Sequence, residues 1–158
     1  MRFFTMVWWC GCQTGDAGDP SAAYAAHLAT VRDRLPPDLL ATEESVSLHD
    51  TRLRELRLVP AEGVLSLGLD SHAGDERLTL TYTGVERFES AADPEVGLGG
   101  PAGYGDLGYC EVDALPGGAF EHRLLFSTGI ELAVVFRGFR LQRAKHAEPG
   151  AAANRGRM

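Results

Sequence analysis

The sequence is poor in the residues and motifs by which many enzymes and secreted proteins are identified. It has three cysteines, two tryptophans and three methionines in 158 residues, and Lys145 is the single lysine among its 15 basic residues. An odd number of cysteines implies no disulfide framework. The chain has no Gly-x-Ser-x-Gly nucleophile motif, no Walker-type phosphate loop and no His-Glu-x-x-His zinc motif. We therefore predict no catalytic residue and no cofactor.

Long apolar runs are also missing. No run approaches the roughly 20 residues that a membrane-spanning helix needs. The apolar segment Arg2–Trp9 is too short for the core of a signal peptide, and it holds two tryptophans where small residues precede a cleavage site. We expect a cytoplasmic protein that contacts no membrane.

Positive charge is scarce in most of the chain, whose net charge is −7. Residues 143–158 carry four basic residues and one acidic residue, so residues 1–142 together carry −10. Nucleic-acid-binding proteins are usually basic, which argues against such a partner. An acidic body instead speeds association with a basic protein.

One amphipathic helix is predicted near the N-terminus. We expect Arg2–Trp9 to form a strand or an extended segment, and the glycine-rich stretch Gly11–Gly18 to form a loop. Asp19-Pro20 then supplies a helix N-cap followed by proline at the first helical position. The apolar residues that follow recur at steps of four, three and four: Tyr24, Leu28, Val31 and Leu35. Pro36-Pro37 ends this helix.

From His49 onward the apolar residues alternate with polar ones, which predicts half-buried antiparallel strands. Leu53 is out of phase with Leu56 and indicates a bulge or a late strand start. The predicted inward-facing side chains are Leu56, Leu58, Leu65, Leu67, Leu69, Leu78, Leu80, Tyr82, Cys110, Val112, Ala114, Phe120, His122, Leu124, Phe126, Ile130, Leu132, Val134 and Phe136. We expect one α+β domain over residues 1–142, with the helix packed on six or seven strands in a sandwich or half-barrel, and a disordered tail over residues 143–158.

A pattern of aromatic residue, any residue, glycine and apolar residue occurs twice. The two copies are Tyr82-Thr83-Gly84-Val85 and Phe136-Arg137-Gly138-Phe139. Each is predicted to be a strand that kinks at its glycine and sends a further apolar side chain inward. The copies reflect either a duplication or two hairpins with the same geometric need.

Few residues have the spacing of a metal or acid–base site. Cys10 and Cys12 are one residue apart, whereas structural zinc sites use Cys-x2–4-Cys and two further ligands. Cys110 lies on the apolar face of a predicted strand, where free cysteine serves as a small hydrophobe. His49 and Asp50 form a metal or acid–base site only if His122 joins them, and His122 lies on an apolar strand face. We predict no metal site.

The better candidate is a group of acidic and tyrosine residues in and beside the glycine-rich loop 91–108, a length of loop that is often functional. Tyrosines interleaved with carboxylates on a protruding loop are typical of a protein-binding edge. We predict that this edge is exposed and that its binding residues are Tyr104, Asp106, Tyr109, Glu111 and Asp113.

A resemblance covers residues 45–141. It is carried by Leu48-His49-Asp50, by Asp106-Leu107-Gly108-Tyr109-x-Glu111-Val112 and by Phe120-Glu121-His122-Arg123-Leu124-Leu125-Phe126-Ser127-x-Gly129-Ile130-Glu131-Leu132, with Trp8-Trp9 near the start. These stretches resemble a family of small uncharacterised bacterial proteins, and related-looking proteins are often proposed as immunity proteins of polymorphic toxin systems. The resemblance implies no catalytic residues. This chain departs from it at Cys110, where an acidic residue is expected.

We therefore favour a non-enzymatic, acidic protein-binding protein, namely an immunity protein that neutralises a basic toxin domain. Two alternatives stay open. One is a small metal-dependent enzyme that uses His49, Asp50 and His122. The other is a small-ligand-binding barrel with loop 91–108 at its mouth.

Overall fold

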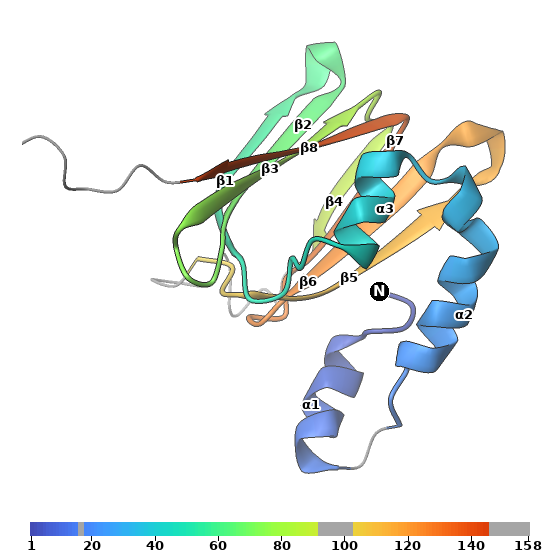
Figure 1. Ribbon diagram of the computed structural model, residues 1–158, viewed down its shortest axis with the longest axis vertical. Coiled ribbons are helices and arrows are strands. Elements are labelled where there is room, and N and C mark those ends of the chain that lie inside the picture. Colours follow the sequence, from blue (N-terminus) through green and yellow to red (C-terminus); the bar gives the residue numbers. More distant parts are fainter. Residues whose placement is uncertain (16–17, 92–102, 146–158) are drawn as a thin grey trace, which may run out of the picture.

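The computed structural model describes residues 1–15, 18–91 and 103–145. In this part of the chain three α-helices precede eight β-strands (Figure 1). The helices are α1 (Met6–Thr14), α2 (Ser21–Val31) and α3 (Pro37–Glu44). The strands are β1 (Arg52–Val59), β2 (Val64–Asp70), β3 (Glu76–Thr83), β4 (Arg87–Ala91), β5 (Leu107–Ala114), β6 (Phe120–Phe126), β7 (Glu131–Phe136) and β8 (Gly138–Lys145).

The strands form two antiparallel sheets around one core. The first sheet has the order β1-β2-β3-β8 and the second the order β4-β7-β6-β5. Inward-facing leucines, valines and aromatic residues of both sheets belong to a single hydrophobic cluster. The predicted α+β class is confirmed, with eight strands in two sheets where six or seven strands were expected. The predicted alternation is confirmed most clearly in β2 and β3, where these side chains are buried: Leu65, Leu67, Leu69, Leu78, Leu80 and Tyr82.

Two connections carry the chain from one sheet into the other, side by side. Strand β3 ends at Thr83 and continues through Gly84 into β4, and β7 continues through Arg137 into β8. The backbone N–H of Arg137 donates to the carbonyl of Thr83 at 3.0 Å. Gly84 has φ +59°, and a Cβ atom there would lie 2.8 Å from the Cβ of Arg137. The two repeated glycine patterns are therefore the two corners of the fold, which bend strands between sheets.

Strand β1 is the outer strand of the first sheet and is only partly covered. Its register shifts between Leu53 and Glu55, which confirms the predicted bulge. Leu56 pairs with Leu67 and Leu58 with Leu65, so these two leucines face the core side of the sheet. They are nevertheless 36% and 39% exposed, because an edge strand has a neighbour on one side only.

Helices α2 and α3 cover the side of the core between the free edges of β8 and β5. Helix α2 packs on β5 and α3 packs on β8. Tyr24 and Val31 of α2 are buried, as their spacing predicts, and Leu39 of α3 is fully buried. A carboxylate oxygen of Asp38 accepts from the backbone N–H of Leu141 at 3.0 Å and so occupies part of the open edge of β8. The structure has three α-helices where one was expected, because residues 6–14 form α1 and the chain resumes a helix directly after Pro36.

Residues 2–9 do not form the expected strand or extended segment. Residues 2–5 have no regular secondary structure, with bends at Phe3 and Phe4, and Met6–Thr14 form α1, which takes up part of the expected loop Gly11–Gly18. The hydroxyl of Thr5 caps the helix by accepting from the N–H of Trp8 at 3.1 Å, and Gly15 ends it with φ 81°. Helix α1 is held by ring contacts with Tyr109 rather than by a buried apolar face of its own.

The ends of the domain differ from the prediction in one respect. Strand β8 runs to Lys145, which pairs with Glu76, so Arg143–Lys145 belong to the sheet and not to the expected tail. Residues 146–158 and most of loop 91–108 lie outside the described residues. In the described part of the chain, no helix has the length and apolar character needed to cross a membrane.

The corner at Gly84 gives a first prediction. Gly84→Ala should destabilise the fold by about 2–4 kcal/mol, because the new methyl group adds a clash with Arg137 to the cost of a positive φ. Gly74→Ala is the matched control: Gly74 has φ +72° with no atom within 4 Å of its Cβ position, so about 1 kcal/mol is expected. Urea unfolding of both variants measures the difference. Equal losses would show that the two corners are not tightly packed.

Candidate functional site

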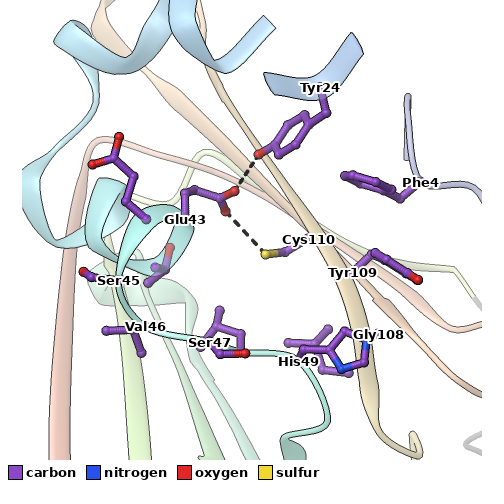
Figure 2. A pocket seen from close by; sticks show the side chains of 14 residues that line it. Phe4, Tyr24, Glu43, Ser45, Val46, Ser47, His49, Gly108, Tyr109 and Cys110 are labelled. Atoms are coloured by element: carbon purple, nitrogen blue, oxygen red, sulfur yellow. Dashed lines mark hydrogen bonds between the residues drawn. The ribbon is translucent and has the colours of Figure 1, made fainter. Parts of the chain in front are cut away.

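Three side chains that can bind metal ions meet at the inner side of α3. They are Glu43 from α3, Cys110 from β5 and His122 from β6. A carboxylate oxygen, the sulfur and a ring nitrogen of these residues all lie within 4.8 Å of one another. We call this group the Glu43–Cys110–His122 cluster. Figure 2 shows Glu43 and Cys110 facing each other at one side of a pocket.

The fold brings these residues together by strand register and helix spacing. Val112 pairs with His122 across β5 and β6, so Cys110, two residues earlier on the same face, is a diagonal neighbour of His122. Glu43 follows the fully buried Leu39 by four residues and therefore faces the sheets from the same side of α3.

Two tyrosines bind members of the cluster by hydrogen bonds. The hydroxyl of Tyr24 donates to Oε2 of Glu43 at 2.8 Å and accepts from the backbone N–H of Val112 at 2.9 Å. The hydroxyl of Tyr82 bonds to Nδ1 of His122 at 2.9 Å. Each tyrosine therefore holds one member of the cluster by a hydrogen bond.

The hydrogen-bonding capacity of the Cys110 thiol and of His122 Nε2 is less well satisfied. The thiol of Cys110 donates to Oε1 of Glu43 at 3.3 Å. His122 is 0% exposed, and its Nε2 has no hydrogen-bond partner among the described residues. A buried polar atom without a partner costs about 1–3 kcal/mol. An atom of this kind is expected where a partner such as a water or an ion completes the site.

Burial dominates the electrostatics of the cluster. It raises the pKa of Glu43, an effect that the bonds from Tyr24 and Cys110 partly offset. It raises the pKa of the Cys110 thiol well above its usual value and lowers the pKa of His122 to about 3. Without a cation, the pair of Cys110 and His122 is thus a neutral thiol and a neutral imidazole. A neutral thiol is a poor nucleophile, which argues against cysteine catalysis.

A pocket of about 460 Å³ adjoins the cluster. Glu43 and Cys110 lie in its wall, with Phe4 and Tyr109 on one side and His49 at the rim (Figure 2). The described residues that line it include carboxylates, hydroxyls and aromatic rings but no lysine or arginine. The pocket therefore suits a cation or a neutral polar ligand better than an anion.

The other candidate ligands are placed apart from the cluster. His49 and Asp50 contact each other at 3.0 Å and are about half exposed. Within the described residues, the cluster is the one group of three such ligands, so His122 joins Glu43 and Cys110 and not His49 and Asp50. The prediction that His122 lies in the core is confirmed. Cys10 and Cys12 are exposed on α1.

Four of the five predicted binding residues take part in contacts within the fold while staying partly exposed. Tyr104 packs edge-on against Phe126, with ring centroids 5.4 Å apart, and Asp106 pairs with Arg52 at 2.7 Å. The ring of Tyr109 stacks on Phe4, Trp8 and Trp9 approach its edges, and Asp113 lies 3.5 Å from Arg2 and 3.4 Å from His27.

Glu111 corrects the prediction of an exposed acidic edge. It is only 5% exposed, and its carboxylate accepts from the backbone N–H groups of Arg2, Phe3 and Phe4 at 2.8, 2.6 and 2.7 Å. The polar face of β5 is therefore covered by the N-terminal segment. Protein binding through these residues stays a prediction, but Glu111 is a structural residue.

Sequence reasoning missed Glu43. Its one signal was the spacing of four residues from Leu39, which places a carboxylate on a buried helix face. Comparison with known proteins adds no further constraint, because no protein-family model matches the chain and no curated protein matches it significantly.

Glu111 gives the prediction for this part of the structure. Glu111→Gln should lower the free energy of unfolding by about 1–3 kcal/mol, because the amide loses the negative charge and one of the two acceptor oxygens that hold the N-terminal segment. Thermal and urea unfolding measure this loss.

The matched control is Glu89→Gln, the same chemical change at a strand residue whose side chain is 60% exposed. It should shift stability by less than about 0.5 kcal/mol. If both variants unfold like the parent, the N-terminal segment is not anchored by Glu111.

Proposed function

We propose that the protein binds a zinc ion at the Glu43–Cys110–His122 cluster, with one coordination position open to the adjoining pocket. Two observations support this most directly: Nε2 of the fully buried His122 has no hydrogen-bond partner among the described residues, and a ring nitrogen of His122 lies within 4.8 Å of ligand atoms of both other residues. Nothing else in the described part of the chain satisfies Nε2.

The donor set favours zinc over other abundant cations. Zinc is bound by cysteine sulfur, histidine nitrogen and carboxylate oxygen, whereas magnesium and calcium require oxygen ligands almost exclusively. Ligand bonds of about 2.0–2.3 Å in a tetrahedron place ligand atoms roughly 3.3–3.8 Å apart. Ligand atoms that lie up to 4.8 Å apart therefore need to close by about 1.5 Å at most around an ion.

The second layer of residues supports the same assignment. A metal-binding histidine usually hydrogen-bonds through its other ring nitrogen, and a metal-binding carboxylate is usually held by a further donor. Tyr82 supplies the first contact and Tyr24 the second. A divalent cation would also offset the cost of burying the ionised forms of Glu43 and Cys110.

Three protein ligands leave a fourth position, which in zinc proteins is taken by water or by a ligand from solution. Glu43 and Cys110 lie in the pocket wall, so this position faces the pocket. A zinc ion at such a position polarises a bound ligand and lowers the pKa of bound water. We infer that the pocket admits a small polar ligand to the ion.

This proposal differs from the function favoured by the sequence. Binding of a basic toxin domain, the cytoplasmic location and the immunity role implied by the resemblance stay predictions. A zinc site is compatible with them, because the cluster lies beneath α3 and takes up none of Tyr104, Asp106, Tyr109 and Asp113.

Metal analysis tests the proposal. Protein purified without a polyhistidine tag and dialysed against zinc should hold about one zinc ion per chain by elemental analysis, and zinc should raise the unfolding temperature because the ion binds the folded state. Replacement by cobalt should give absorption from a thiolate–cobalt bond.

Variants separate the cluster from other residues. Cys110→Ser and Glu43→Gln should weaken zinc binding by roughly a hundredfold or more, and Tyr24→Phe by roughly ten- to a hundredfold through loss of its hold on Glu43. The control is Cys12→Ser, which removes an exposed thiol on α1 and should bind like the parent. Folded parent protein that takes up no zinc would refute the proposal, as would Cys110→Ser protein with parental affinity.

A further inference from the structure

Strand β1 presents an open edge. It hydrogen-bonds to β2 on one side, and on the other side the described residues pair with it only at its first residue, through the bridge between Arg52 and Asp106. The opposite end of the same sheet is different, because α3 packs on β8 and Asp38 binds the N–H of Leu141. In Figure 1, β1 and β2 lie on the side of the molecule away from the helices. Natural proteins usually cover or disrupt such an edge, since it can pair with another strand.

We propose that β1 pairs antiparallel with β1 of a second copy of this chain, about a two-fold axis that passes beside Leu56. The first sheet would then continue through the axis as one eight-stranded sheet, in the order β8-β3-β2-β1 followed by the same strands of the partner in reverse. This interface is isologous, so the same strand must be complementary to itself.

The sequence of β1 selects the register. In a symmetric antiparallel pair, one residue lies opposite its own copy. An axis at Arg54, Glu55 or Arg57 would place two like charges directly opposite each other, which destabilises a sheet. An axis at Leu56 instead places two leucines together.

The same register pairs the charges on either side of the axis. It sets Glu55 of each copy opposite Arg57 of the other, which gives two cross-strand pairs of opposite charge. Among registers with the axis at residues 54–57, this one alone places no like charges directly opposite each other at the axis and pairs the charges beside it with opposite charges.

The exposure of β1 is consistent with this partner. Leu56 and Leu58 face the core side of the sheet yet are 36% and 39% exposed. Pairing would bring the two Leu56 side chains together on that side and extend the apolar surface across the axis. Glu55 is 64% exposed and Arg57 is also exposed, so both are accessible to the second copy.

Two eight-residue edges bury less area than the roughly 800 Å² per partner of a standard stable interface. We therefore expect a weak dimer whose population rises with protein concentration. Its formation does not depend on zinc, because β1 contributes no residue to the Glu43–Cys110–His122 cluster.

Charge exchange on β1 tests the register. Sedimentation velocity over a concentration series should show the parent protein passing from monomer to dimer. Glu55→Arg and Arg57→Glu should each weaken dimerisation by roughly tenfold or more, because each creates two like-charge pairs. The double variant E55R/R57E restores opposite charges in both pairs and should recover most of the parental affinity.

The control is Glu62→Arg, which makes the same charge change at an exposed residue outside β1 and should dimerise like the parent. Thermal unfolding establishes that each variant is folded. A parent that is monomeric at every concentration overturns the proposal. So does a dimer that is unaffected by the single exchanges, or one that the double exchange fails to restore.

Discussion

The hydrogen bond between the N–H of Arg137 and the carbonyl of Thr83 marks the constraint on which the rest of the fold depends: two neighbouring strands must leave one sheet and enter the other together. Because they turn at the same place, the inner faces of both sheets close on one core. The turn also leaves the edges of β8 and β5 on one side of that core without a strand between them. Helices α2 and α3 fill this side, and the position of Glu43 is a consequence of that packing.

The Glu43–Cys110–His122 cluster shows the energetic cost of placing a carboxylate on the inner side of α3. Glu43 is carried inward by the helix face that also buries Leu39, and it meets a thiol and an imidazole on the strands below. The two tyrosines bind Glu43 and Nδ1 of His122, and Nε2 of His122 has no partner among the described residues. A core built for stability alone would be better served by apolar side chains at these positions. The presence of the polar Glu43–Cys110–His122 cluster is therefore the main structural reason to assign a function to this part of the molecule.

The local sequence pattern was sufficient to predict much of the fold. Alternation predicted the inward residues of β2 and β3, the phase of Leu53 predicted the bulge in β1, and the apolar neighbours of His122 predicted its burial. These features depend on residues close in sequence. The prediction for the N-terminal segment was wrong because its partner, Glu111, is more than a hundred residues away. Nothing in the local sequence therefore distinguishes this segment and its helix from a strand. The candidate site was missed for the same reason: Glu43, Cys110 and His122 come from three elements that only the packing of α3 brings together.

The anchoring of the N-terminal segment also has a consequence for the order of events during synthesis and folding. The backbone of residues 2–4 is synthesised before the carboxylate that binds it, which is 107–109 residues further along the chain. Docking must therefore wait until β5 has been made and placed in its sheet. Closing a loop of that length is entropically costly, and contacts between distant residues slow folding. Residues 2–4 are thus among the last parts of the fold to reach their final position, and the aromatic residues of α1 stay accessible to other partners until they do.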